Sequence, residues 1–224
     1  MAYPSVSGPY GFRPVNLIGA QVFAGGTRQL PIQYGYATNI FYGDLVNLAR
    51  GTIVKNTDTT DSTGNGLVGV FLGCTYTNPT TKQKQFSQYW PASTLAGDAT
   101  AYVCDDPDTV FQVVMCSATT TVASSAIPSI GQNYGLIQNA GSANTGDSAV
   151  ALLWSATTTT ADLAARVVGL VPETAITTSA TGSSSGTTIT LTGSGLPIAI
   201  PVGTDRSEEH TSELQSRLHL VCRL

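Results

Sequence analysis

The stretch GLVGVFLGCTY, residues 66–76, decides the fold class of this chain. Its apolar side chains fall on both alternating faces, and its valines and aromatic residues favour extended backbone. A segment of this kind is typical of a strand that is covered on both sides. We therefore predict that residues 66–76 form a buried core strand.

Shorter strand-like segments lie on either side of this stretch and are separated by turn residues. Two of them, Leu45–Leu48 and Thr52–Lys55, are separated by Arg50-Gly51 at the spacing of a β-hairpin. The best helical candidate, Thr160–Val168, is short and becomes β-branched toward its end. Such repeated strands predict a mainly β fold, a small β-barrel or sandwich, over residues 28–174. The remaining predicted strands are Gln85–Trp90, Ala99–Cys104, Thr109–Cys116, Ala149–Trp154 and Ala165–Val171.

The segments outside this domain have different compositions. Residues 1–27 alternate prolines with aromatic residues, which excludes a long helix and predicts an extended N-terminal arm. A disordered terminus is the alternative, although disordered segments are usually poor in aromatic residues. Residues 175–186 form a Ser/Thr/Gly linker. The alternating TTITLT that follows predicts that residues 187–205 begin a second β-module, which is truncated.

The truncation is inferred from residues 206–216, RSEEHTSELQS. This string resembles the in-frame translation of a common short-read sequencing adapter. A genuine charged C-terminal helix is the alternative, since Leu214, Leu218 and Val221 fall near helical spacing. We predict that residues 206–224 are a non-native, adapter-derived tail, and such segments are left out of fold reasoning.

Without that tail, the composition argues against several kinds of chemistry. Both histidines, His210 and His219, lie in the tail, and Glu173 is the single glutamate before it. Hydrolytic triads need a base that titrates near neutral pH, and ordinary zinc sites need clustered histidine and cysteine. Neither glycine-rich phosphate-binding pattern occurs. We therefore predict a protein that is not an enzyme and carries no cofactor.

Charge and hydropathy restrict the partners. Residues 1–205 carry seven basic and eleven acidic side chains, a net charge of −4, whereas nucleic-acid binding depends on lysine and arginine. No apolar run approaches the roughly 20 residues of a membrane-spanning helix, and the N-terminus does not resemble a secretory signal. So few charges predict a surface that partner subunits cover.

A cluster of carboxylates is the densest polar group in the sequence. Asp105, Asp106 and Asp108 could ligate Ca²⁺ through oxygen. However, Pro107 lies among them, the EF-hand spacing is absent, and Asp-Pro is common in turns, so we interpret the cluster as a turn. Asp106 with Glu173 is a conceivable glycosidase pair, but nothing in the sequence selects it.

Aromatic and cysteine side chains give two further groups of candidates. Tyr76, Tyr89 and Trp90 could stack on a sugar or a partner, although aromatic residues in strands more often pack in a core or an interface. The three cysteines before the tail have irregular spacing and predict small buried side chains rather than disulfides: Cys74, Cys104 and Cys116. No residue is therefore assigned a catalytic, cofactor-binding or metal-binding role.

Several stretches together resemble virion structural proteins that tailed phages encode in marine metagenomes. The pattern G-D-x-V-x-L…G-T-x-V…G-V-x-x-G is also similar to small β-barrel capsid decoration proteins. The linker and second module depart from the simplest members of that class. The matching stretches are YPSVSGPYGFRPVNLIGAQVFAG (residues 3–25), FYGDLVNLARGTIVK (41–55), GVFLGCTYTNP (69–79), QYWPAST (88–94) and AYVCDDPD (101–108).

The resemblance implies a capsid decoration protein that stabilises a phage head by covering its surface. A head-fibre, collar or tail component is the first alternative, and a carbohydrate-binding or hydrolytic domain is the second. The partners would be the major capsid protein or other virion subunits, with the chain itself as a homo-oligomer such as a trimer. Its location would be the virion, assembled in the host cytoplasm.

Overall fold

The computed structural model describes residues 8–19, 21–58, 67–123, 125, 127–158 and 163–171, together with the backbone of short strands between residues 175 and 223. The described chain is mainly β, as the sequence predicts, and its single helical turn is the 3-10 segment Ile127–Ser129. No helix in these ranges is long and apolar enough to cross a bilayer.

Most strands belong to two sheets, named here sheet A and sheet B. Sheet A contains β1 (Arg13–Leu17), β2 (Gln21–Val22), β9 (Thr109–Ala118), β10 (Thr121–Val122), β11 (Asn133–Ile137), β12 (Ala151–Thr158), β13 (Ala165–Leu170) and β19 (His219–Arg223). Sheet B contains β3 (Arg28–Pro31), β4 (Leu45–Ala49), β5 (Thr52–Lys55), β6 (Leu67–Thr77), β7 (Lys84–Ser87) and β8 (Thr100–Cys104).

The strand order within each sheet defines the architecture. Sheet A runs β12-β11-β13-β19-β9-β1-β2, and sheet B runs β3-β8-β6-β4-β5 with β7 beside β6. A single bridge between Ile32 and Ile53 brings the edges of sheet B together, and Leu152 and Leu153 of β12 also pair with β9. The two sheets are not closed into a barrel. Of the two predicted architectures, barrel and sandwich, the sandwich-like fold therefore fits.

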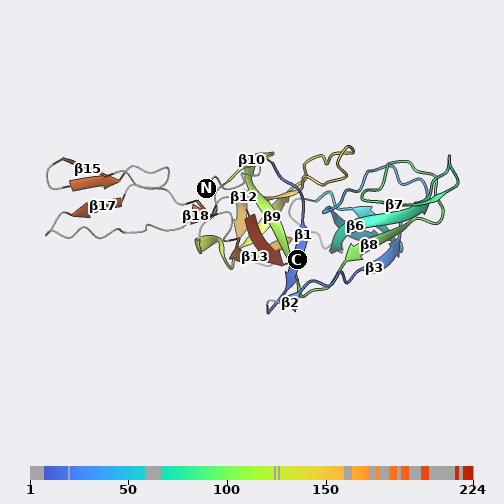
Figure 1. The fold of residues 1–224 in the computed structure, drawn as a ribbon, viewed down its shortest axis with the longest axis horizontal. Helices are drawn as coiled ribbons and strands as arrows, with labels where there is room; N and C mark the ends of the chain where they lie inside the picture. The colour runs from blue at the N-terminus through green and yellow to red at the C-terminus, as the bar shows by residue number, and fades with distance from the viewer. Residues whose placement is uncertain are drawn as a thin grey trace.

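Sheet B is inserted into sheet A along the chain. The chain begins in sheet A with β1 and β2, forms all of sheet B between β3 and β8, and returns to sheet A with β9 (Figure 1). β1 pairs antiparallel with β9, from Arg13 opposite Gln112 to Leu17 opposite Thr109. The strands before and after the insertion are thus hydrogen-bonded to each other.

β6 is the core strand that the sequence predicts. It pairs with β4 near its start, with β8 along its middle and with β7 at its end. Its neighbours approach so closely at Gly69 that a Cβ there would lie 2.1 Å from the carbonyl oxygen of Cys104. Glycine is therefore needed at this position, because any side chain would force β6 and β8 apart.

The predicted hairpin between β4 and β5 is confirmed. Its two central residues, Arg50 and Gly51, have φ angles of 50° and 83°. Two positive φ angles match the twist of the flanking strands in a two-residue hairpin. The turn sets the register that places Val46 opposite Lys55.

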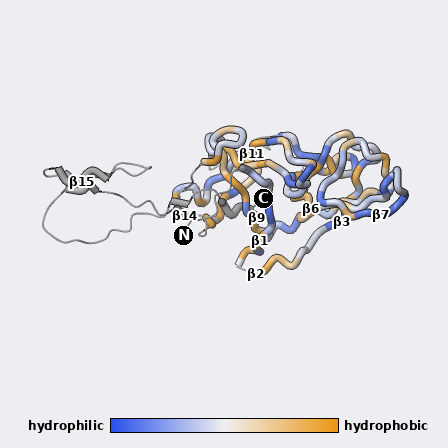
Figure 2. The backbone as a smooth tube through the Cα atoms, turned by 45° about the horizontal axis from the view of Figure 1, so that its top comes forward, coloured by the Kyte–Doolittle hydropathy of each residue, from blue (hydrophilic) through white to orange (hydrophobic). Residues whose placement is uncertain are grey.

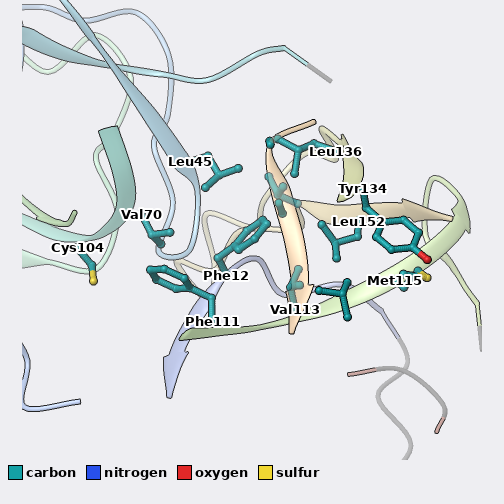
Figure 3. Close-up of a cluster of buried hydrophobic side chains, with 14 residues drawn as sticks. Phe12, Leu45, Val70, Cys104, Phe111, Val113, Met115, Tyr134, Leu136 and Leu152 are labelled. Carbon is teal, nitrogen blue, oxygen red and sulfur yellow. The ribbon is translucent and has the colours of Figure 1, made fainter. Parts of the chain in front are cut away.

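The two largest apolar clusters stabilise sheets A and B. One core lies where the sheets meet and joins Leu45 and Val70 of sheet B to Phe111 and Met115 of sheet A (Figure 3). The other fills sheet B and includes fully buried Trp90. Figure 2 shows hydrophobic stretches alternating with hydrophilic ones along both sheets, with a hydrophilic tip beside β7. The long strands β6 and β9 are buried on both faces over most of their length, whereas the short strand β7 alternates between exposed and partly buried positions.

The expected N-terminal arm over residues 1–27 differs from the structure. Phe12 is fully buried in the core where the sheets meet, with its ring edge-on to Phe111 at 6.3 Å. Residues 13–17 are β1, which is part of sheet A. The prolines mislead here because Pro14 lies near the start of a strand, where the missing N–H is tolerated. Residues 1–7 of the predicted arm lie outside the described residues.

The structure also differs in detail from the predictions for the C-terminal residues. Residues 165–168 of the helical candidate belong to β13, and residues 160–162 are outside the described part. The predicted second module contains a three-stranded sheet: β15 (Gly182–Ser185), β16 (Thr188–Leu191) and β17 (Ile198–Pro201). β15 thus lies within the segment expected to be a linker. β14 (Ala175–Ile176) pairs with β18 (Gln215–Ser216).

The stretch 206–224, expected to stand outside the natural fold, contributes backbone to sheet A. Within it, β19 pairs antiparallel with β13 on one side and β9 on the other. Backbone pairing depends little on side-chain identity, since every non-proline residue offers one donor and one acceptor. The adapter-like origin of residues 206–216 therefore stays a prediction.

Replacing Phe12 should destabilise the fold strongly. We expect Phe12→Ala to lower the free energy of unfolding by about 3–5 kcal/mol, because it leaves a cavity where the two sheets meet. The matched control is Phe86→Ala, since Phe86 is 80% exposed and the same truncation there should change stability by less than about 0.5 kcal/mol. Urea unfolding followed by tryptophan fluorescence measures both. Equal effects of the two variants would show that Phe12 is not a core residue.

Candidate functional site

A buried ion pair lies where the two sheets meet. Asp44, fully buried just before β4, is 3.0 Å from the Nζ of Lys55 through its Oδ2. The backbone N–H of Phe41 donates to the same oxygen at 2.8 Å, and the hydroxyl of Ser148 donates to Oδ1 at 2.6 Å. The carboxylate is thus satisfied on both oxygens, as a buried charge must be.

The local sequence around Asp44 explains how it reaches this position. Gly43 has a φ of 88°, and a Cβ there would lie 3.0 Å from the backbone nitrogen and oxygen of Phe12. The Phe12 N–H donates to the carbonyl of Gly43 at 2.9 Å, and Ser148 N–H donates to the carbonyl of Tyr42 at 2.9 Å. Gly43-Asp44 therefore connects β1, sheet B and the segment before β12. Since Asp44 is inaccessible, this arrangement supports structure rather than chemistry.

A second cluster of polar side chains lies between this junction and the surface. Arg13 forms an ion pair with Asp147 at 2.7 Å, and the side-chain amide of Gln88 donates to the same carboxylate oxygen at 2.8 Å. The guanidinium carbon of Arg13 lies 4.7 Å from the ring centroid of Tyr42 and 5.6 Å from that of Tyr10. Partly exposed ion pairs contribute little alone, but stacking and a shared acceptor fix the position of Arg13.

Two hollows open on the described surface. One, of about 470 Å³, lies on sheet B between Tyr102 and Phe86, with Gln88 at its border. The other, of about 360 Å³, lies near the junction of the sheets and is lined by Asp105, Asp106 and apolar side chains such as Phe111. The hollow on sheet B is the shallower and more open of the two.

The predicted carboxylate cluster forms a turn. The N–H of Asp108 donates to Oδ1 of Asp106 at 2.9 Å, and the N–H of Thr109 donates to the carbonyl of Asp106 at 3.0 Å. Asp105 forms an ion pair with Arg28 at 2.7 Å. The described residues contain no group of three or more metal-ligating side chains in suitable positions. Glu173, the other member of the conceivable glycosidase pair with Asp106, lies outside the described residues.

Each predicted aromatic candidate packs against another aromatic ring, and Tyr89 is half-buried. Tyr76 and Trp90 are buried and meet edge-on, with ring centroids 5.3 Å apart. Tyr89 stacks on Phe41 at 5.5 Å. These three side chains therefore stabilise sheet B and its covering loops, and they are not available to a ligand as a group.

The three cysteines of the described chain are buried and free. Burial raises the pKa of Cys74 to about 12, and its thiol donates a long hydrogen bond to the carbonyl of Tyr89 at 3.5 Å. Burial also raises the pKa of Cys116, and that of Cys104 in spite of a hydrogen bond with Thr109 that opposes the shift. A thiol with a raised pKa is a poor nucleophile, so these cysteines act as apolar side chains.

Sequence reasoning did not find Asp44, Ser148 or the group around Asp147. The predicted strand begins at Leu45, directly after Asp44, and the role of Asp44 depends on Ser148, which lies 104 residues away. Phe86 and Tyr102 were placed in strands without any indication that they face the same hollow. Pairing between distant strands determines both features, and no local pattern reports it.

Comparison with known proteins gave no match: no family model, no curated protein and no solved structure is similar to this chain.

Removing one partner of the buried ion pair should destabilise the fold more than replacing both partners. We expect Asp44→Asn to lower the free energy of unfolding by about 3–5 kcal/mol, because Lys55 keeps its charge without a partner. Adding Lys55→Met should restore part of the loss. Asp106→Asn is the control, since this exposed residue can form the same turn as asparagine. A double variant no more stable than Asp44→Asn in urea would refute the unpaired-charge explanation.

The raised pKa of Cys74 predicts sensitivity to alkali. In the unfolded chain the thiol of Cys74 has its ordinary pKa of 9.0, whereas in the folded chain burial raises this pKa to about 12. Its contribution is therefore complete below pH 9 and is lost as the pH rises toward 12, at about 1.4 kcal/mol per pH unit. Cys74→Ala should flatten the decline in unfolding free energy above pH 9. Parallel declines in both proteins would contradict this role.

Proposed function

We propose that this chain is a structural subunit of a phage virion that covers the capsid surface, as a decoration or stabilisation protein. The proposal assigns it no reaction and no cofactor. Its action would be to bury surface on a neighbouring capsid subunit. The β1–β2 hairpin, residues 13–22, supplies the observation that carries this proposal.

Three apolar side chains project from the hairpin into solvent. Val15, Ile18 and Val22 are 37%, 45% and 79% exposed. The ordered part of sheet A ends at β2, so the outer edge of this strand has no partner among the described strands. An edge strand with exposed apolar side chains favours pairing with a strand of another chain.

The rest of the described surface supports a role in binding rather than catalysis. Two of its charged side chains, Arg13 and Asp105, are held in ion pairs with Asp147 and Arg28. A capsid repeats the same surface many times, so modest affinity at each contact is sufficient for occupancy. The partner would be the major capsid protein, and contacts between copies of this chain around a symmetry axis would strengthen binding.

A head-fibre, collar or tail component is the second candidate. The separate sheet β15-β16-β17 favours it, because this sheet pairs with no strand of sheets A or B. A module of this kind, carried after the main body, is suited to an elongated appendage. Electron microscopy of gold-labelled protein on intact virions would distinguish the head surface from the neck or tail.

The capsid proposal predicts binding through the hairpin. The full chain would be mixed with shells assembled from the major capsid protein encoded beside this gene, and the shells would be sedimented through sucrose. We expect saturable co-sedimentation of the wild type and at least about tenfold weaker binding of the double variant Ile18→Ser and Val22→Ser, because both lost side chains are apolar anchors.

The control for this experiment is Leu95→Ser, an exposed apolar residue in a loop of sheet B. This variant should bind like the wild type, and thermal unfolding should show all variants folded. Absence of wild-type binding, or absence of a capsid gene beside this one, would discard the decoration role. Equal binding of the hairpin variant would discard the hairpin as the contact.

A further inference from the structure

The hollow on sheet B lies on a different part of the molecule from the β1–β2 hairpin. Its lining residues come mainly from β8, β6 and β7 of sheet B. Figure 1 shows these strands at one end of the molecule. The lining consists of eight residues: Tyr42, Leu72, Gly73, Cys74, Phe86, Ser87, Gln88 and Tyr102. Nothing in the proposed contact with a capsid uses this surface.

Strand register places two aromatic side chains on opposite sides of the hollow. Tyr102 of β8 pairs with Gly73 of β6, and Phe86 of β7 pairs with Thr75 of β6. Gly73 and Thr75 are two residues apart, so all four positions face the same side of the sheet. β8 and β7 flank β6, which separates their backbones by roughly 10 Å. A flat ring between two aromatic side chains needs about 7 Å.

Gly73 keeps the floor of the hollow open. Its φ is 137°, and a Cβ would lie 3.1 Å from the carbonyl oxygen of Ser87. A side chain here would strain the backbone and press against the backbone of Ser87 and Gln88 at the border of the hollow. Phe86 itself is 80% exposed, which leaves most of its ring free to contact a ligand.

The polar groups at the border are uncharged and held in place. Gln88 donates one amide hydrogen to Asp147 at 2.8 Å, which orients the amide. The Ser87 hydroxyl donates to the carbonyl of Tyr89 and accepts from the N–H of Tyr89 at 3.3 Å, so it is engaged within the chain. Asp147 is itself neutralised by Arg13. No lysine, arginine, aspartate or glutamate lines this hollow, so its chemistry suits a neutral ligand.

We propose that this hollow binds a neutral pyranose sugar, with its ring between Phe86 and Tyr102. The C–H groups of a pyranose face carry partial positive charge and pack on the negative face of an aromatic ring. The hydroxyl groups around the sugar ring both donate and accept, which matches the amide of Gln88 and the hydroxyls of Tyr42 and Tyr102. One ring in an open hollow gives weak binding, and multiple copies of the site on one particle would multiply it.

Saturation-transfer difference NMR tests the proposal with the full chain. The probes are methyl β-D-glucopyranoside, methyl β-D-galactopyranoside and N-acetyl-D-glucosamine, each at millimolar concentration, followed by a panel of neutral oligosaccharides. We expect saturation of the C–H protons on one sugar face and millimolar affinity for at least one probe. Phe86→Ala should weaken this binding about tenfold, whereas Phe86→Tyr should keep it.

Leu95→Ala serves as the matched control, because Leu95 is exposed on sheet B but lies outside the hollow. Binding that Phe86→Ala weakens and Leu95→Ala leaves intact supports the sugar site. Absence of binding to every probe and oligosaccharide overturns it, as does binding that Phe86→Ala does not change. A proline decamer that binds through Phe86 where sugars do not would show a peptide groove and would also overturn it. Capsid sedimentation of Phe86→Ala should match the wild type, so the two proposals can fail separately.

Discussion

The hydrogen bonds and ion pair of one buried carboxylate, Asp44, join the parts of this fold. A buried charge is costly unless every lone pair finds a partner, and here the partners come from three separate segments: Phe41, Lys55 and Ser148. The carboxylate therefore specifies how the β4–β5 hairpin of sheet B sits against the segment before β12. Apolar packing supplies most of the free energy, but many arrangements of apolar surfaces are nearly equivalent. A satisfied buried charge selects one of them.

The insertion of sheet B into sheet A explains why so much of the structure converges on this junction. The chain crosses between the sheets after β2 and again before β9, and β1 is hydrogen-bonded to β9 at the point of return. Phe12, Gly43 and Asp44 all lie where these crossings meet. An interaction lost here would loosen both sheets together, whereas the exposed face around Phe86 can vary without affecting them. The residues that join the two sheets thus lie apart from the exposed face around Phe86.

Local sequence was sufficient for the strands that have a strong pattern of their own. The apolar run of β6 and the Arg50-Gly51 hairpin were predicted correctly, because both depend on residues that are neighbours in the chain. β1 and β11 were missed, since Pro14 and Gly135 weaken their strand pattern and pairing with β9 or β12 compensates. The ion pair of Asp44 and the hollow beside Phe86 were beyond sequence reasoning, because residues far apart along the chain build both.

The way sheet B enters and leaves the body has an evolutionary consequence. Its first strand, β3, pairs with its last, β8, and Arg28 forms an ion pair with Asp105 beside them. The entrance and the exit of the inserted segment are therefore adjacent. A segment with adjacent ends tolerates insertions and deletions at its far tip, beside β7, while the residues that join it to sheet A are kept. Changes at that tip would alter the outer face of sheet B and leave its junction with sheet A unchanged.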